Sequence, residues 1–485
     1  MNQISMHYIA LFALLCSRTI NGSLETINIE RLCFDPIQIT TNKHQRAVST
    51  RPEPLKPWTI VVYMAADNDM HNFAFANIRQ MAQIGSSENA NILVHLNIKL
   101  SNTTKITRRY YIEKEKITCV SNPSENEPGM DSGDPKTLFS CCKWAIEEYP
   151  AQKYALILWN HGTGCLEPYT ESRSINTRKA LIARNKIEQI QQEKHTPNTV
   201  STVHNLDKTF TNWLHQEHIP KRGVCWDSTT GNHISNNDLA RVLKQVNKEL
   251  LMGKKWSIIG FDTCLMAMAE VACDIKEYAH LMVASQETEL GPGWNYAHAF
   301  SKLRTGAPTG IEFATSIIHA YEETYKPITR EYTLSVINLD QFYLLEENIH
   351  QVARIIIEIA QQASSVNILK TFRASASKLF CTHFDEPSFI DLHHLYSNML
   401  GNIKPTHETT NKNTPDSTAQ LIESLKNGLA IIEHIVIANV TGKGLSRARG
   451  ISIYVPEKTL HQTYTQTRFA QSNNWLHLLH LHLRR

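Results

Sequence analysis

A cysteine and a histidine hold matching positions after two apolar segments of the chain. The isoleucine-rich run 257–261 predicts a buried strand, and Cys264 follows shortly after it. The run 154–159 predicts a second buried strand, and His161 follows that one. The carboxyl ends of parallel strands lie on one edge of a sheet, so the two side chains can converge. A neutral histidine beside a thiol is the arrangement of a general base and a nucleophile.

Each of the two residues also has a plain structural interpretation. Cys264 taken alone could be an inert buried thiol, and His161 is one of 23 histidines and could be a capping or core residue. Their paired placement favours catalysis. The sequence further predicts a helix over 265–278, whose N-terminus would lower the pKa of the Cys264 thiol.

Two neighbouring residues could contribute to catalysis or to substrate binding. Gly162 frees the backbone beside the histidine, so its N–H and that of Cys264 could stabilise a developing oxyanion. Asp262 lies just before Cys264, where its carboxylate could pair with a basic substrate side chain. The alternative for Asp262 is a cap on the following helix.

The elements around these residues alternate in type. Strands are predicted at 59–65, 91–98, 109–112, 154–159, 257–261 and 281–285, with helices between them. The sequence Asp67-Asn68-Asp69 is expected to cap the helix that follows the first of these strands. This succession predicts an α/β fold with a mainly parallel central sheet and helices on both faces, followed by a smaller C-terminal α+β part. The predicted divisions are a signal peptide (1–23), a pro-segment or linker (24–57), a main domain (58–330) that contains an inserted linker (165–222), and an accessory domain (331–485).

Composition narrows the functional classes and the compartment. The net charge of +3 over 485 residues gives no indication of a nucleic-acid partner. No apolar run reaches the roughly 18 residues that a membrane span needs. The apolar run 8–16 predicts a signal peptide and export, with a buried N-terminal helix as the alternative. None of the ten cysteines forms a CxxC or zinc-type spacing, so no metal cluster is expected.

Several motifs, in the same order, resemble the clostripain family of cysteine peptidases. They are Tyr63 to Asp69 (Tyr-Met-Ala-Ala-Asp-Asn-Asp), Leu156 to Gly162 (Leu-Ile-Leu-Trp-Asn-His-Gly), Cys225 to Asp227 (Cys-Trp-Asp), Gly260 to Met266 (Gly-Phe-Asp-Thr-Cys-Leu-Met), Ala284 to Glu287 (Ala-Ser-Gln-Glu) and Gly291 to Trp294 (Gly-Pro-Gly-Trp). A weaker likeness continues through Phe389 to Leu392 and Gly450 to Tyr454.

This resemblance implies a caspase-like fold in the main domain, shared more distantly with gingipains, legumains and separases. It implies that His161 and Cys264 are the catalytic dyad, that Gly162 belongs to the oxyanion hole, and that Asp262 lies at the floor of a pocket for arginine or lysine. It also points to Glu287 or Glu289 as a further acid in that pocket.

The implied activity is a cysteine endopeptidase that cuts after arginine or lysine through an acyl-enzyme. The alternatives are a catalytically silent homologue that binds peptides or a partner, and a transpeptidase that uses the same dyad. Family members are often cleaved between the histidine and the cysteine, and the candidate residues in this chain are Arg178, Lys179, Lys221 and Arg222. No cofactor is required by this chemistry. Clostripain itself depends on calcium, so calcium is a possible cofactor, although the chain has no EF-hand type loop.

Overall fold

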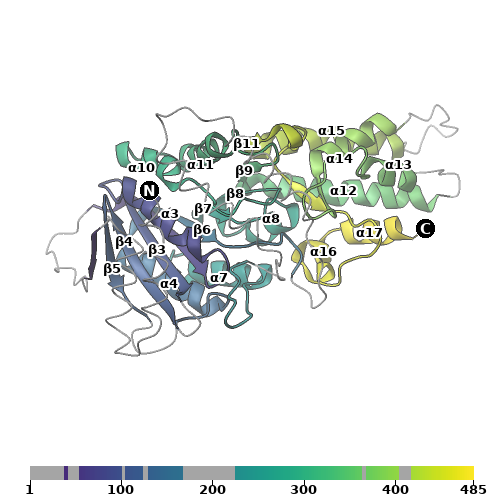
Figure 1. Ribbon diagram of the computed structural model, residues 1–485. Coiled ribbons are helices and arrows are strands. Elements are labelled where there is room, and N and C mark those ends of the chain that lie inside the picture. Colours follow the sequence, from purple (N-terminus) through teal and green to yellow (C-terminus); the bar gives the residue numbers. More distant parts are fainter. Residues whose placement is uncertain are drawn as a thin grey trace, which may run out of the picture.

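The computed structural model describes residues 38–41, 54–100, 104–123, 129–167, 224–362, 368–403 and 417–484. Within these ranges the centre of the molecule is a ten-stranded sheet (Figure 1) with the strand order β1-β5-β4-β3-β2-β6-β7-β8-β9-β11. In chain order these strands are β1 (Gln38–Thr41), β2 (Lys56–Ala66), β3 (Ala90–Lys99), β4 (Lys105–Glu113), β5 (Lys116–Ser121), β6 (Ala151–Trp159), β7 (Trp256–Asp262), β8 (Ala279–Ala284), β9 (Thr333–Asn338) and β11 (Val436–Thr441).

Five adjacent strands at the centre of the sheet (β3, β2, β6, β7 and β8) run parallel. Successive side chains of these strands point into two hydrophobic cores on opposite faces of the sheet. In β2, for example, Tyr63 belongs to one core and Val62 to the other. Burial on both faces explains why these strands read as continuous apolar runs in the sequence.

Helices cover both faces of the sheet, as the sequence predicts. Side chains of α3 (His71–Ile84) and α11 (Gly310–Tyr325) belong to one core. Side chains of α4 (Pro135–Glu148), α7 (Asn236–Glu249) and α8 (Ala269–Ile275) belong to the other. The short helices α9 (Tyr296–Ala299) and α10 (Ser301–Thr305) precede α11.

The C-terminal part both extends the sheet and packs beside it. β9 pairs antiparallel with β8, and β11 pairs antiparallel with β9, so two strands beyond residue 330 continue the central sheet. The other elements are α12 (Phe342–Gln361), α13 (Ile368–Ser375), β10 (Phe389–Asp391), α14 (Leu392–Asn402), α15 (Ser417–Ile435), β12 (Ser452–Tyr454), α16 (Arg468–Ser472) and α17 (Trp475–Leu483). β10 and β12 form a small antiparallel sheet. The division of the chain at residue 330 stays a prediction.

One local prediction differs from the structure. The single short strand expected at 109–112 is a hairpin of β4 and β5 that turns at Glu115, which has a φ of 57°. Both strands mix polar and apolar residues, so they lack the continuous apolar signal of the central strands. The segment 24–57 contains β1, which pairs parallel with β5, and its assignment as a pro-segment or linker stays a prediction.

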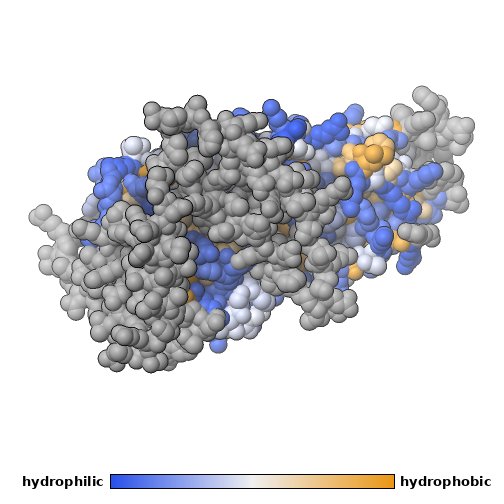
Figure 2. Space-filling view, in the orientation of Figure 1, coloured by the Kyte–Doolittle hydropathy of each residue, from blue (hydrophilic) through white to orange (hydrophobic). Residues whose placement is uncertain are grey.

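The described surface in Figure 2 is largely hydrophilic, with a compact hydrophobic group over the bundle of α13, α14 and α15. Large apolar side chains exposed in the C-terminal part include Leu379, which is 83% exposed, and Phe380, which is 53% exposed. Among the helices of the described ranges, none combines the length and the apolar character needed to cross a membrane.

Candidate active site

β6 and β7 bring the histidine and the cysteine to the same edge of the sheet. Trp159, the last residue of β6, pairs with Asp262, the last residue of β7. His161 and Cys264 each follow this pair by two residues, so both lie just beyond the carboxyl ends of neighbouring parallel strands. The two segments pack closely, since a Cβ atom added to Gly162 would lie 2.5 Å from the carbonyl oxygen of Cys264.

Replacing Gly162 with alanine is expected to lower stability and activity together. The new Cβ would lie 2.5 Å from the Cys264 carbonyl oxygen and 2.9 Å from Oγ1 of Thr263, so the turn that carries the cysteine must shift. Overpacking of this kind costs about 1–3 kcal/mol, and a small displacement of a reacting group costs about 10²-fold in rate. Thermal unfolding and the alkylation rate of Cys264 measure the two effects.

The control for this substitution is Gly306→Ala, because no atom lies within 4 Å of a Cβ at that position. A melting temperature for Gly162→Ala that matches the control would contradict the argument from close packing.

His161 is held by a carboxylate that comes from the adjacent strand β2. Asp69 follows β2 closely, and its Oδ1 lies 2.9 Å from Nε2 of His161. The two side chains are mostly buried, with 12% of His161 and 17% of Asp69 exposed. From the sequence, Asp69 is one of three residues expected to cap a helix, but the N-cap of α3 is Met70, which makes no side-chain cap hydrogen bond. The pattern that marks helix caps therefore hid the contact between Asp69 and the histidine.

Cys264 lies in a turn, and the helix after it begins later than the sequence predicts. α8 starts at Ala269, five residues beyond the cysteine. Leu265 has a φ of 64°, in the left-handed region that branched side chains rarely adopt. Its backbone N–H donates to the carbonyl of Glu287 at 3.3 Å, which holds the turn against the loop after β8. The helix that follows Cys264 thus begins after residue 265, and the pKa of the thiol is raised, so the prediction of a helix that lowers it was wrong.

The surroundings of the Cys264 thiol favour its neutral form. The side chain is partly buried, and its Sγ donates to the backbone carbonyl of Glu289 at 3.7 Å. Burial, and next to it the negative charge of Glu289, raise the pKa of Cys264 to about 12. The resting group is therefore a thiol, and a base has to take its proton during any attack on a substrate.

Two buried carboxyl groups form an acidic pair close to Cys264. The oxygens of Asp262 accept hydrogen bonds from the backbone N–H of Trp294 at 3.1 and 3.2 Å and from the hydroxyl of Tyr296 at 2.7 Å. Glu289 is 5% exposed, and its carboxyl group lies next to the side chains of Asp262 and Trp294.

The two acids of this pair influence each other. Burial raises the pKa of Asp262 to about 7, against the opposing effect of its hydrogen bonds. Burial raises the pKa of Glu289 well above its usual range, and the neighbouring charge of Asp262 adds to that shift. We call Asp262 and Glu289 the acidic pair. Asp262 is not the cap of the following helix, since the N-cap of α8 is Met268.

Glu287, the other acid expected near the pocket, makes different contacts. Its Oε1 accepts hydrogen bonds from the backbone N–H of Thr288 at 2.8 Å and of Asp385 at 3.0 Å. These bonds attach the loop after β8 to the C-terminal part. Glu289 therefore lies beside Asp262, whereas Glu287 stabilises the loop after β8.

The C-terminal part braces the same loop and the cysteine turn. The side chain of Gln286 donates to Oδ2 of Asp391 at 3.0 Å and accepts from the backbone N–H of Gly450 at 2.8 Å. The backbone N–H and hydroxyl of Ser452 donate to the carbonyl of Ala267 at 2.8 and 3.0 Å. These partners lie in the two late motifs of the family resemblance, for which the sequence alone indicates no chemistry.

The remaining predicted features are not part of this arrangement. Arg178, Lys179, Lys221 and Arg222 lie outside the described residues. Where the structure describes the chain, no three or more His, Cys, Asp and Glu side chains gather in a way that could hold a metal ion. A calcium requirement therefore stays a prediction.

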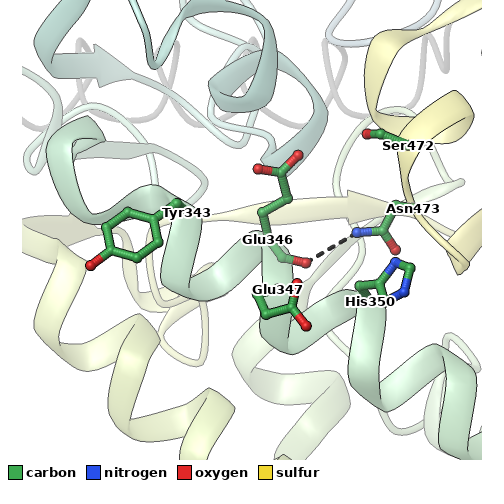
Figure 3. A pocket seen from close by; sticks show the side chains of 6 residues that line it. All are labelled: Tyr343, Glu346, Glu347, His350, Ser472 and Asn473. Carbon is green, nitrogen blue, oxygen red and sulfur yellow. Dashed lines mark hydrogen bonds between the residues drawn. The ribbon is translucent and has the colours of Figure 1, made fainter.

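Figure 3 shows a pocket of about 350 Å³ on the C-terminal part, which none of the sequence-predicted site residues lines. Its lining residues are Tyr343, Glu346, Glu347, His350, Ser472 and Asn473. The side-chain amide of Asn473 donates to the backbone carbonyl of Glu346 at 3.1 Å across it. This pocket belongs to the packing of α12 against the segment between α16 and α17.

Comparison with known proteins agrees with this geometry. The family model described as the clostripain family matches residues 62–180 and 211–480. Clostripain of Hathewaya histolytica is 24% identical over 298 residues, which cover 56% of this chain and 46% of that protein. The chain thus matches less than half of the length of this curated relative.

Two solved structures share the fold. An inactive zymogen C11 protease from Parabacteroides distasonis superposes with a TM-score of 0.56 at 17% identity, over 87% of this chain and 99% of its own. A secreted C11 cysteine protease from Bacteroides thetaiotaomicron, in complex with an irreversible peptide inhibitor, gives a TM-score of 0.55 at 17% identity over the same shares. These likenesses show the caspase-like fold that the sequence predicts. Because the family model covers most of its length, the chain belongs to the clostripain family of cysteine peptidases.

Proposed function

We propose that this protein is a cysteine endopeptidase that hydrolyses peptide bonds after arginine or lysine. The observation that carries the proposal is the acidic pair beside the Cys264 thiol, at the sheet edge that also holds His161. Membership of the clostripain family supports the cysteine-peptidase chemistry. The peptide inhibitor bound to the relative from Bacteroides thetaiotaomicron supports a peptide substrate.

The proposed reaction follows from the neutral state of the thiol. His161 takes the proton of Cys264 as Sγ attacks the carbonyl carbon of the scissile bond. The backbone N–H groups of Gly162 and Cys264 stabilise the oxyanion of the tetrahedral intermediate. His161 then protonates the leaving amine, the C–N bond breaks, and an acyl-enzyme remains. Water, activated by His161, attacks this thioester, releases the new carboxyl terminus and restores the thiol.

The acidic pair explains why a basic side chain is preferred before the scissile bond. The oxygens of Asp262 accept hydrogen bonds from Trp294 and Tyr296, and the buried carboxyl group of Glu289 lies beside Asp262 and has the largest charge effect on Cys264. A guanidinium or ammonium group offers several donors and no acceptor, so it suits these oxygens. We infer that Glu289 contacts the substrate cation directly and that Asp262 adds a second negative charge behind it.

Binding of basic substrates is expected to weaken as the pH falls below about 7. Burial raises the pKa of Asp262 to about 7, so this acid gains a proton across this range and loses its attraction for a cation. Burial also raises the pKa of Glu289 well above its usual range. The free energy of unfolding changes in the opposite direction. Because the raised pKa means that the folded state binds protons more tightly than the unfolded state, this pair stabilises the fold more as the pH falls. The measurement is KM against pH for a reporter with arginine before the scissile bond.

The control for this pH dependence is the Glu289→Gln protein, in which one of the two titrating acids is gone. A KM for the wild type that stays constant from pH 8 to pH 5 would contradict the role of the pair.

A panel of fluorogenic peptides tests the function as a whole. The peptides differ only in the residue before the scissile bond, which is arginine, lysine, aspartate or asparagine. Cleavage after arginine and lysine alone is the expected result. Cleavage after aspartate or asparagine would contradict the assigned specificity, and the absence of any cleavage would favour a silent peptide-binding homologue.

Self-processing and export are further parts of the proposal. An enzyme that cuts after basic residues would find targets at Arg178, Lys179, Lys221 and Arg222, between its two catalytic residues. Terminal sequencing of the purified chains identifies the bond that is cut. Export is supported by the predicted signal peptide and by the relative described as secreted.

A further inference from the structure

The contact between Asp69 and His161 fixes which nitrogen of the imidazole can act as a base. Oδ1 of Asp69 lies 2.9 Å from Nε2 of His161. An ionised carboxylate only accepts hydrogen bonds, so Nε2 carries the hydrogen in this contact. A neutral imidazole is protonated on one nitrogen, and the basic lone pair is therefore on Nδ1.

The neighbouring backbone holds this contact in a fixed geometry. Asn68, just before Asp69, donates from its side chain to the backbone carbonyl of Trp226 at 2.9 Å. Asn160, just before His161, accepts from the backbone N–H of Trp226 at 2.9 Å. One residue thus ties together the two segments that carry the acid and the histidine. Such shared support is what a precisely oriented side-chain pair requires.

We propose that Asp69 is a positioning residue, which holds His161 with hydrogen on Nε2 so that Nδ1 takes the proton of Cys264. This inference rests on the proposed function and deepens it. In the attack the S–H bond breaks, the proton moves to Nδ1, and the S–C bond forms. The imidazolium is then flanked by the Asp69 carboxylate, which stays ionised. Nδ1 returns the proton to the leaving amine when the C–N bond breaks.

The carboxylate contributes charge as well as orientation. The thiol gives up its proton reluctantly, because burial and nearby acids raise the pKa of Cys264 to about 12. A negative charge beside the imidazole makes it a stronger base and stabilises the imidazolium that forms. Removal of the corresponding orienting carboxylate from a catalytic histidine costs up to about 10⁴-fold in kcat. We expect a loss of about 10²–10⁴-fold here.

The experiment compares the full-length wild type with Asp69→Asn and Asp69→Glu. Two quantities are measured: kcat and KM against pH on an arginine reporter, and the rate at which iodoacetamide alkylates Cys264, followed by mass spectrometry of the peptide that contains it. The matched control is Glu433→Gln, which removes the acid from another carboxylate–histidine pair, since Oε1 of Glu433 lies 3.3 Å from Nε2 of His393. Melting temperatures establish that each variant is folded.

For Asp69→Asn we expect a lower kcat with little change in KM, an acid limb of the kcat profile shifted to lower pH, and slower alkylation of Cys264. Asp69→Glu, which keeps the charge, should recover part of the loss, and Glu433→Gln should match the wild type. A folded Asp69→Asn protein with wild-type kcat, pH limb and alkylation rate would overturn the inference.

The two readouts separate this inference from the proposed function. If the wild type cleaves no peptide but Asp69→Asn still slows alkylation, the function fails and the positioning role holds. If the wild type cleaves after arginine and Asp69→Asn leaves both readouts unchanged, the function holds and the positioning role fails.

Discussion

The Cys264→Ala protein is expected to retain its fold and to lose hydrolysis of arginine and lysine reporters by at least about 10⁴-fold, because the nucleophile is gone. The sulfur makes one long hydrogen bond to the carbonyl of Glu289, at 3.7 Å, and the side chain is only partly buried. Its removal should therefore cost little stability. The variant should also remain uncut between His161 and Cys264, if that cleavage is performed by the protein itself.

Cys119→Ala is a suitable control, because Cys119 donates a similar hydrogen bond to a backbone carbonyl, that of Ser121 at 3.6 Å, on the distant strand β5. It should keep full activity. Reporter assays and gels of the purified chains provide the measurements. Hydrolysis by Cys264→Ala at the wild-type rate would remove Cys264 as the nucleophile.

Glu289→Gln is expected to lower kcat/KM for arginine and lysine reporters by about 10²–10³-fold, which corresponds to roughly 3–4 kcal/mol for the loss of one partner of a buried charge pair. The substitution keeps the shape of the side chain but replaces the oxygen that would face the cation with an amide group. Asp262→Asn should also reduce activity, and it should lower stability because Tyr296 and Trp294 donate to that carboxyl group. The assay is kcat/KM with arginine, lysine and glutamine reporters.

Glu287→Gln separates this effect from a general loss of acidity near the cysteine. Glu287 accepts hydrogen bonds from Thr288 and Asp385 and is not part of the acidic pair. The Glu287→Gln protein should keep the preference for basic residues even if the loop after β8 loses some stability. An unchanged ratio of arginine to glutamine cleavage in Glu289→Gln would contradict the role of Glu289.

The central strands, and the positions of His161 and Cys264 just beyond the ends of two neighbouring strands, could be predicted from the sequence. Strands buried on both faces are continuous apolar runs, and the end of such a run locates the sheet edge to within a residue or two. The structure bears this out in the pairing of Trp159 with Asp262. Gly162 was singled out for its backbone N–H, and the close approach of the Cys264 carbonyl gives a second reason for glycine there.

The features that the sequence could not supply depend on tertiary contacts. The helix predicted from residue 265 begins at Ala269, because the loop after β8 holds Leu265 in the left-handed region. Local propensity cannot detect that contact. Asp69 carries a local pattern typical of a cap, so its bond to His161 became visible only with the strands in place. Glu287 and Glu289 are equivalent acids in the sequence and differ only in which groups they meet.

The hydrogen bond from Ser452 to Ala267 joins residues 185 positions apart in the chain. Contacts of such high sequence separation form late in folding, since the entropy of closing a long loop is lost before the contact returns any stability. On the ribosome, the thiol-bearing turn emerges long before the strand that braces it has been made. A nascent chain therefore carries His161 and Cys264 before it carries Ser452, whose hydrogen bond supports the turn after the cysteine.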